Sequence, residues 1–154
     1  MKLLKVYTSP IGDISIIEEE NKIIEISFGV KSGIEKGSSL LLEKTENELQ
    51  EYFEGKRTEF DIPIKLKRTE FYEKVWNELK KIPYGETRSY GEIAEKIGNP
   101  KASRAVGMAN HNNPISIIVP CHRVVGKNSK LVGYAGGLDK KKYLIELERK
   151  VKSV

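Results

Sequence analysis

The sequence predicts an α+β chain with two small domains. Residues 3–28 alternate apolar and polar side chains, as strands do, whereas residues 71–111 place apolar side chains at helical spacing between Pro and Gly breaks. The formal charge changes sign along the 154 residues, and the polar, basic segment 65–70 lies at the change. We therefore expect domains at 1–66 and 67–154, each of a size that can fold as a unit.

The first domain is expected to form a meander, a helix and a further strand. Its alternating runs, separated by short turns, are residues 4–9, 13–19 and 22–28. Residues 40–55 then place apolar side chains on one helical stripe that stops at Gly55, namely Leu41, Leu42, Leu49, Tyr52 and Phe53. Residues 58–64 are expected to add a short strand.

The second domain begins with helices. The run 71–82 has helical periodicity and breaks at Pro83. Ser89 and Glu92 have the spacing of a capping box, in which each side chain satisfies a backbone amide of the other residue. A short helix should therefore extend from there to Ile97.

A second short helix is expected directly afterwards. Gly98 can end the first one, and Asn99-Pro100 supplies a cap and a first-turn proline for a helix over 101–110. Two short helices joined in this way form a helix-turn-helix.

Beyond it we expect a hairpin and a last helix. Residues 115–125 and 131–137 are expected to be extended and to flank a basic turn at 126–130, and residues 138–151 should be helical. A helix-turn-helix followed by a hairpin with a basic tip is the winged-helix plan. By itself that plan favours a DNA-binding regulator.

The basic charge belongs to the second domain. Residues 1–66 hold 9 basic and 13 acidic side chains (net −4), and residues 67–154 hold 18 and 9 (net +9), which together give the overall +5. Residues 97–138 contain no Asp or Glu. Their cations are Lys101, Arg104, Arg123, Lys127 and Lys130. The pattern is typical of a polyanion-binding surface, although a chance gap in acidic residues on a solvated face would look the same.

The second helix of the helix-turn-helix is unusual for a reader of DNA sequence. Most of its side chains are too small to reach a base edge: Ala102, Ser103, Ala105, Gly107 and Ala109. Arg104 is the long side chain among them. It could enter a gap in a base stack while the helix backbone, which carries few bulky side chains, lies close to the DNA. The alternative is a helix packed tightly on its neighbour, with Arg104 contacting a phosphate.

The single cysteine excludes an internal disulfide and a multi-cysteine zinc site, and it indicates a reduced, intracellular protein. Cys121 follows Pro120 and precedes His122, one of two histidines. A thiol needs a nearby base or cation to react, and both occur here, so we interpret Cys121 as a nucleophile. An inert buried thiol is the alternative. On a strand Cys121 and His122 would point to opposite faces, so their contact would need a turn at Pro120 or a bridging water.

Several motifs together resemble the O6-alkylguanine-DNA alkyltransferases, also called methylated-DNA-protein-cysteine methyltransferases. In that family's order and spacing they are Ser103-Arg104-Ala105-Val106-Gly107, Asn113-Pro114, Pro120-Cys121-His122-Arg123-Val124 and Tyr134-Ala135-Gly136-Gly137-Leu138. The resemblance is dense from Phe71 to Glu148, whereas residues 1–66 match in architecture more than in motif. It implies an RNase H-like N-terminal domain and a C-terminal winged-helix domain that carries the active cysteine.

The resemblance also implies an activity and the residues that perform it. Cys121 would take the alkyl group from O6 of guanine in DNA, and less well from O4-methylthymine, in one irreversible turnover. Glu148 would orient His122, which takes the thiol proton through a water. Tyr90 would donate a hydrogen bond to guanine N3 and supply the proton that the departing base needs.

Other residues would position the DNA and the base. Arg104 would fill the space left by a flipped nucleotide while the helix around Ser103 and Gly107 enters the minor groove. Asn113 would brace the loop around the active site. Backbone contacts to the base would come from Cys121, Val124 and Ala135. Several relatives have serine where this chain has Ala135, so the leaving-group step depends on whether the backbone amide suffices there.

Double-stranded DNA carrying O6-alkylguanine is the expected partner, bound by a monomer. No metal or other cofactor is expected, because the thiol and the alkyl group are the reactants and His111 has no spaced Cys or His partner. No apolar run approaches the length of a membrane span, so we expect a cytoplasmic protein without membrane contacts. Two further alternatives remain: an alkyltransferase-like protein that binds lesions without transfer, and a Cys-His hydrolase.

Overall fold

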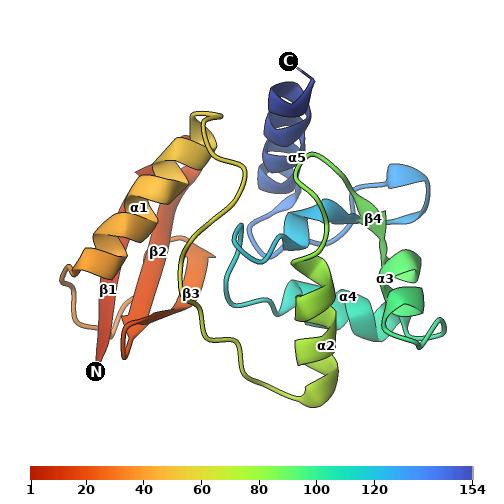
Figure 1. The fold of residues 1–154 in the computed structure, drawn as a ribbon, viewed down its shortest axis with the longest axis horizontal. Coiled ribbons are helices and arrows are strands. Elements are labelled where there is room, and N and C mark those ends of the chain that lie inside the picture. The colour runs from red at the N-terminus through yellow and green to blue at the C-terminus, as the bar shows by residue number, and fades with distance from the viewer. Residues whose placement is uncertain (154) are drawn as a thin grey trace. The chain divides into compact units, whose positions relative to one another are not determined.

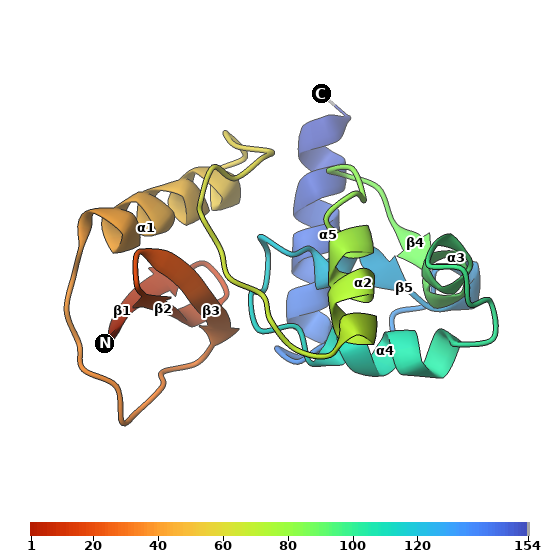
Figure 2. The same cartoon turned by 60° about the horizontal axis from the view of Figure 1, so that its bottom comes forward.

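The computed structural model describes residues 1–153 and divides into two compact units. The first unit is Met1–Leu66, and the second begins at Lys67. Figures 1 and 2 show a sheet with one long helix in the first unit and a group of helices in the second. The α+β class predicted from the sequence is confirmed.

The first unit is a three-stranded sheet with a helix across one face (Figure 1). The strands β1 (Lys2–Ser9), β2 (Gly12–Glu19) and β3 (Lys22–Phe28) pair antiparallel in the order β1-β2-β3. Glu20 and Asn21 take positive φ angles of 52° and 63°, the conformation that a tight two-residue hairpin turn requires. The predicted meander is confirmed.

The helix α1 (Leu40–Phe53) closes the core of this unit. The Ser39 side chain accepts the amide hydrogen of Leu42 at 3.0 Å and so caps the helix start. Gly55 takes φ +76° just after the helix, which explains why the apolar stripe stops there. Helix and sheet bury apolar side chains together, among them Leu4, Ile14, Ile16, Ile26, Leu42, Leu49 and Tyr52.

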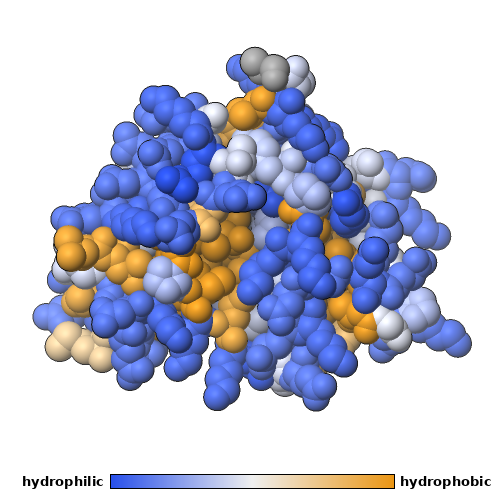
Figure 3. All heavy atoms as spheres, viewed as in Figure 1, coloured by the Kyte–Doolittle hydropathy of each residue, from blue (hydrophilic) through white to orange (hydrophobic). Residues whose placement is uncertain are grey.

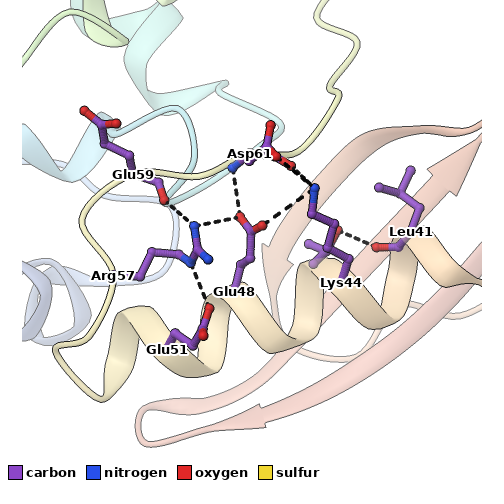
Figure 4. Close-up of polar contacts among 8 residues, drawn as sticks. Leu41, Lys44, Glu48, Glu51, Arg57, Glu59 and Asp61 are labelled. Carbon is purple, nitrogen blue, oxygen red and sulfur yellow. Dashed lines mark hydrogen bonds and ion pairs between the residues drawn. The ribbon is translucent and has the colours of Figure 1, made fainter.

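The strand expected at 58–64 does not form, and a single bridge between Ile23 and Ile64 joins this segment to the sheet in the described chain. Polar contacts hold it against α1 instead, as Figure 4 shows. Their centre is Glu48, which is 4% exposed and accepts the Asp61 amide hydrogen at 2.9 Å. Because the carboxylate is buried, protein donors must replace the water that it has lost.

Two cations complete this cluster. Arg57 Nη1 lies 3.6 Å from the Glu48 carboxylate, while Arg57 Nε donates to Glu51 at 2.9 Å. Lys44 Nζ donates to the Asp61 carbonyl at 2.6 Å and lies 3.9 Å from Glu48. The segment after α1 is therefore fixed by side chains of the helix rather than by strand pairing.

The second unit contains the predicted helix-turn-helix (Figure 2). Its helices are α2 (Glu70–Leu79), α3 (Tyr90–Lys96), α4 (Ser103–His111) and α5 (Leu138–Lys152), of which α3 and α4 form the motif. Ser89 and Glu92 make the predicted capping box at the start of α3. Trp76 of α2 is buried, and its Nε1 donates to the Ala109 carbonyl of α4 at 2.8 Å, which joins these two helices.

The helix α4 begins later than predicted. Ser103 is its first residue, and Ala102 precedes it without a side-chain cap. Asn99 and Pro100 belong to a turn, in which the Asn99 amide donates to the Ala94 carbonyl of α3 at 2.9 Å. This pair therefore lies in the turn between the two helices and not in the second helix, because the Asn99 amide bonds back to α3 while its carbonyl accepts the Ala102 amide hydrogen at 3.0 Å.

The predicted hairpin is wrong. The strand β5 is only Val124–Val125, and it pairs in parallel with β4 (Arg88–Ser89). The basic segment 126–130 is a tight loop closed by a backbone hydrogen bond of 2.8 Å between its ends, with a 3-10 turn at Lys127–Ser129. Residues 131–137 form no strand. Apolar composition did not specify a pairing partner for either segment.

No helix within residues 1–153 is long and apolar enough to cross a membrane. Figure 3 shows one face of the molecule, on which hydrophilic residues cover most of the surface and apolar residues form smaller areas between them. This agrees with the 32% of charged residues in the sequence.

Glu48→Ala should destabilise the segment after α1. The change removes the acceptor of the Asp61 amide and the partner of Arg57, so we expect the free energy of unfolding to fall by about 1–3 kcal/mol. Urea denaturation measures the loss, and hydrogen exchange should show faster exchange at the Asp61 amide. Glu46→Ala, on the same helix and 3.9 Å from Lys5 Nζ, is the control and should change stability by less than about 1 kcal/mol. Equal effects of both changes would contradict the central role of Glu48.

Candidate active site

Cys121 lies in a buried turn. It begins a 3-10 turn, Cys121–Arg123, and Pro120 precedes it with φ −81° and ψ 66°. Its amide donates to the Val119 carbonyl at 2.8 Å, and the residue is 3% exposed. The sequence placed Cys121 on an extended segment, which is wrong. The turn that would let Cys121 and His122 share one site is present after Pro120.

Asn113 braces the chain that leads into this turn. Its Oδ1 accepts the Ile115 amide hydrogen at 3.0 Å, and its Nδ2 donates to the Val119 carbonyl at 2.8 Å. Between these points the buried Ile117 takes φ +73°, which a β-branched residue adopts only where its surroundings impose it. One amide side chain therefore holds a strained loop directly before the cysteine.

Glu148 of α5 orients the buried imidazole of His122. Nε2 of the histidine lies 2.6 Å from Oε2 of the carboxylate. An ionised carboxylate can only accept, so Nε2 carries the hydrogen and Nδ1 keeps a lone pair. Nδ1 is buried and has no hydrogen-bond partner within residues 1–153. The arrangement leaves His122 one basic nitrogen that can take a proton.

Glu148 is held by several donors. Arg123 donates to both carboxylate oxygens, from Nε at 2.8 Å and from Nη2 at 3.1 Å, and the Gly85 amide donates at 3.1 Å. Arg123 Nη1 also reaches the Ile82 carbonyl at 2.7 Å. Burial by itself raises the pKa of Glu148, but His122 and Arg123 outweigh burial and hold this pKa well below its usual range. The carboxylate is therefore an anion in the folded protein.

Burial also sets the resting protonation of the two neighbouring side chains. It lowers the pKa of His122 below its ordinary 6.5, against the opposing charge of Glu148. It raises the pKa of the Cys121 thiol, although the Asn113 amide and the Lys141 ammonium oppose the rise. The pair is thus a neutral imidazole and a protonated thiol, and this thiol needs a base before it can react.

Tyr90, the first residue of α3, lies close to the same cysteine. Its hydroxyl donates to the Val132 carbonyl at 3.1 Å, and its ring lies 3.9 Å from where a Cβ on Gly107 would stand. Burial raises the pKa of Tyr90, and negative charge on Cys121 raises this pKa further. The phenol therefore keeps its proton at neutral pH and is available as a donor.

Lys141 is a buried cation that sequence reasoning missed. Its Nζ donates to the carbonyls of Val132 and Gly133 at 2.8 and 3.1 Å and lies 5.8 Å from the centre of the Tyr90 ring. Burial lowers the pKa of Lys141 to about 8. The ammonium thus fixes the loop that Tyr90 contacts and adds positive charge near Cys121.

A signal for Lys141 was present in the sequence. The lysine run 140–142 is typical of a solvated helix face, so composition alone gives no sign that its middle residue points inward. Helical periodicity identifies it, because the buried residues of α5 are Lys141, Leu144, Ile145 and Glu148. Arg123 was predicted as one of the cations of the basic segment and as a positive charge near the thiol, and nothing in its spacing pointed to Glu148.

The other predicted site residues lie outside this buried cluster, or were expected to act through their backbone groups. Arg104 is exposed on α4, next to the half-buried Ser103. Val124 is buried in β5, and Ala135 is exposed in the turn between Tyr134 and Gly137. Residues 1–153 contain no group of three or more His, Cys, Asp or Glu side chains that could hold a metal ion.

Comparison with known proteins gives matches across both units. Residues 3–66 match the family described as 6-O-methylguanine DNA methyltransferase, ribonuclease-like domain, and residues 70–150 match its DNA binding domain. A methylated-DNA–protein-cysteine methyltransferase of Methanosarcina acetivorans is 50% identical, with 93% of this chain and 96% of the relative covered.

Two further matches have similar coverage. The constitutive methylated-DNA–protein-cysteine methyltransferase of Bacillus subtilis is 43% identical, with 92% of each chain covered. The crystal structure of Mycobacterium tuberculosis OGT in complex with DNA has a TM-score of 0.91 and 42% identity, and covers 97% of this chain and 94% of its own.

The buried His122 should make stability depend on pH. Its folded pKa lies below the unfolded value of 6.5, so the unfolded chain binds more protons just below pH 6.5 and stability falls on acidification through that window. One such group changes the free energy of unfolding by at most about 1.4 kcal/mol per pH unit. Urea denaturation at pH 7.5, 6.5 and 5.5 measures the slope.

His122→Gln should flatten this slope, because the titrating imidazole is gone. His111→Gln is the matched control, since His111 is exposed at the end of α4. A slope that stays the same in His122→Gln would show that other groups cause the acid sensitivity.

Proposed function

This chain belongs to the 6-O-methylguanine DNA methyltransferase family, and from that premise we propose how it repairs DNA: Cys121 takes the alkyl group from O6-alkylguanine. The N-terminal unit is the family's ribonuclease-like domain, and the C-terminal unit is its DNA-binding domain. The observation that carries the assignment is the buried thiol in the same turn as His122. Within residues 1–153 the histidine Nδ1 has no hydrogen-bond partner, and its Nε2 is bound by Glu148.

The transfer is a single displacement at the alkyl carbon. The Cys121 sulfur forms a bond to the alkyl carbon as the bond from that carbon to guanine O6 breaks. The thiol proton goes to His122 Nδ1, directly or through one water, and the resulting imidazolium is stabilised by the Glu148 anion. The product is a thioether on the protein, and since no step removes it each molecule acts once.

Tyr90 supplies the proton that the departing base needs. The leaving group is a guanine anion, and a proton at N3 neutralises it. Tyr90 is a suitable donor because its raised pKa keeps the phenol protonated and because it lies close to Cys121. In the absence of DNA its hydroxyl donates to the half-buried Val132 carbonyl, a hydrogen bond that one to the base would replace.

DNA binding is a property of the family's C-terminal domain, and we assign its contact surface to α4. A base in a duplex must leave the stack before a buried thiol can reach it. Arg104 is exposed beside the small residues of α4, so it can enter the space that the base leaves while the helix lies in the minor groove. One copy of the chain carries all these groups, which supports action as a monomer.

The backbone around the base completes the proposed pocket. Asn113 holds the loop before Cys121, and Lys141 holds the carbonyls of Val132 and Gly133 in the loop before Ala135. At Ala135 the chain offers a backbone amide and no hydroxyl. We therefore assign contact with the alkylated edge of the base to backbone groups there.

Methyl transfer to Cys121 tests the function directly. Incubation with a duplex that carries one O6-methylguanine should add one methyl group to the peptide that contains Cys121, with one methyl per protein and no turnover, as mass spectrometry of the digest will show. Cys121→Ser should bind the same duplex and transfer nothing. Loss of the methyl group from DNA with Cys121 unmodified would exclude this mechanism, and lesion binding without any loss would favour a lesion-binding protein.

Tyr90→Phe should slow transfer more than it weakens binding. The change removes a proton donor and keeps the ring, so the single-turnover rate should fall by roughly a hundredfold while the Kd for duplex DNA changes little. Rapid-quench kinetics and fluorescence anisotropy measure the two quantities. Tyr72→Phe, on α2, is the control and should leave both unchanged. Equal losses of rate and affinity in Tyr90→Phe would contradict the role of proton donor.

A further inference from the structure

Arg123 is a buried cation to which the proposed reaction assigns no step. It is 8% exposed, whereas Lys127 and Lys130 in the following loop are exposed. Its guanidinium donates to Glu148 Oε1 from Nε at 2.8 Å, to Glu148 Oε2 from Nη2 at 3.1 Å and to the Ile82 carbonyl from Nη1 at 2.7 Å. Burying a charge costs free energy even when it is paired in this way, so the position of Arg123 calls for an explanation.

One oxygen of Glu148 is shared between Arg123 and His122. Oε2 accepts the Arg123 Nη2 hydrogen at 3.1 Å and lies 2.6 Å from His122 Nε2, while Oε1 accepts from Arg123 Nε and from the Gly85 amide. Two parallel hydrogen bonds between a guanidinium and a carboxylate fix the plane of the carboxylate. Arg123 therefore holds Glu148 in the orientation in which it meets the imidazole.

Arg123 also changes the charge that His122 experiences. Burial lowers the pKa of His122, the Glu148 anion opposes that change, and the positive charges of Arg123 and Lys141 lower this pKa further. Because a guanidinium stays charged in proteins, Arg123 offsets part of the Glu148 charge at every working pH. An imidazole that faced the carboxylate without Arg123 would take up its proton at a higher pH.

The other titratable groups around this pair keep one charge state in mild acid. Burial raises the pKa values of Cys121, Tyr134 and, on the loop after α2, Tyr84, so all three stay protonated. Lys141 of α5 has a pKa lowered to about 8 and is an ammonium below it. Proton uptake between pH 5 and pH 7 at this site therefore belongs to the coupled pair of His122 and Glu148.

We propose that Arg123 is a positioning residue for the transfer: it holds the Glu148 carboxylate against His122 and offsets part of its charge, so that the imidazole stays an unprotonated base in mild acid. This inference rests on the proposed function, because the imidazole acts as a base only in the reaction of Cys121. Without Arg123 the same carboxylate would favour an imidazolium, which cannot take the thiol proton.

NMR titration of the protein alone tests the effect on the imidazole. The chain has two histidines, so labelling histidine side chains with 13C gives two imidazole signals, and His111→Gln identifies the one from His111. In Arg123→Gln the imidazole of His122 should take up its proton at a pH about one unit higher than in the wild-type protein. This measurement does not depend on methyl transfer.

The pH dependence of transfer tests the effect on the reaction. Single-turnover methyl transfer from a duplex that contains O6-methylguanine is measured between pH 5 and pH 7.5. In Arg123→Gln the fall of the rate on acidification should begin at a pH about one unit higher than in the wild-type protein. Arg123→Lys keeps the charge but not the paired hydrogen bonds, so it should be slower at every pH and keep the wild-type pH dependence.

Controls separate the local charge of Arg123 from general effects. Arg149→Gln removes an exposed cation next to Glu148 on α5 and should change neither titration, because solvent and salt screen that charge. Arg123→Met is a second uncharged variant if the glutamine does not fold, and circular dichroism checks the fold of each. If neither uncharged variant folds, Arg123→Lys decides between the outcomes, because the charge is then the property that is kept.

Each outcome has a separate meaning. A shift of both titrations in the uncharged variants, but not in Arg123→Lys or Arg149→Gln, supports the proposal, as does an unshifted Arg123→Lys where it alone folds. A rate that falls equally at every pH in the uncharged variants overturns it and leaves Arg123 a purely structural residue, and a full shift in Arg123→Lys overturns it too. If the wild-type protein transfers no methyl group to Cys121, the proposed function itself fails, whatever the NMR titration shows.

Discussion

The buried carboxylate of Glu148 is the constraint on which the site depends. His122, Arg123 and the Gly85 amide all donate to it, so it ties α5 to the turn after Pro120 and to the loop after α2. A buried anion is tolerated only while its donors surround it. These segments cannot separate without leaving a charge unpaired, and the tautomer of His122 follows from the same contact.

Side chains, rather than strand pairing, position the loops of the site. Asn113 bonds the backbone on both sides of the strained Ile117, and Lys141 bonds the Val132 and Gly133 carbonyls. Irregular backbone in a protein interior needs side-chain partners of this kind, because no strand pairing supplies hydrogen bonds to its N–H and C=O groups. Burying a lysine and an asparagine costs free energy, and in this site the two side chains fix the loops beside the Cys121 thiol and the Tyr90 phenol.

Local signals predicted much of the fold. The meander, α1, the capping box at Ser89 and the helix-turn-helix were all confirmed, because strand alternation, helical periodicity and end caps depend on neighbours in the sequence. The hairpin after Cys121, the strand at 58–64 and the start of α4 were wrong. Each of these depends on a pairing partner or a backbone bond that lies elsewhere in the chain, and apolar composition does not name that partner.

The sequence by itself determined that one thiol, placed between a proline and a histidine in a basic domain, would be the centre of the chemistry, and its motifs placed the chain in its family. Only the tertiary structure decided which groups surround that thiol. Arg123 on Glu148, Lys141 near the Tyr90 ring and the Asn110 amide on the Cys121 carbonyl bring different elements of the chain together. Burial and hydrogen-bond geometry assign their roles, and both exist only once the chain has folded.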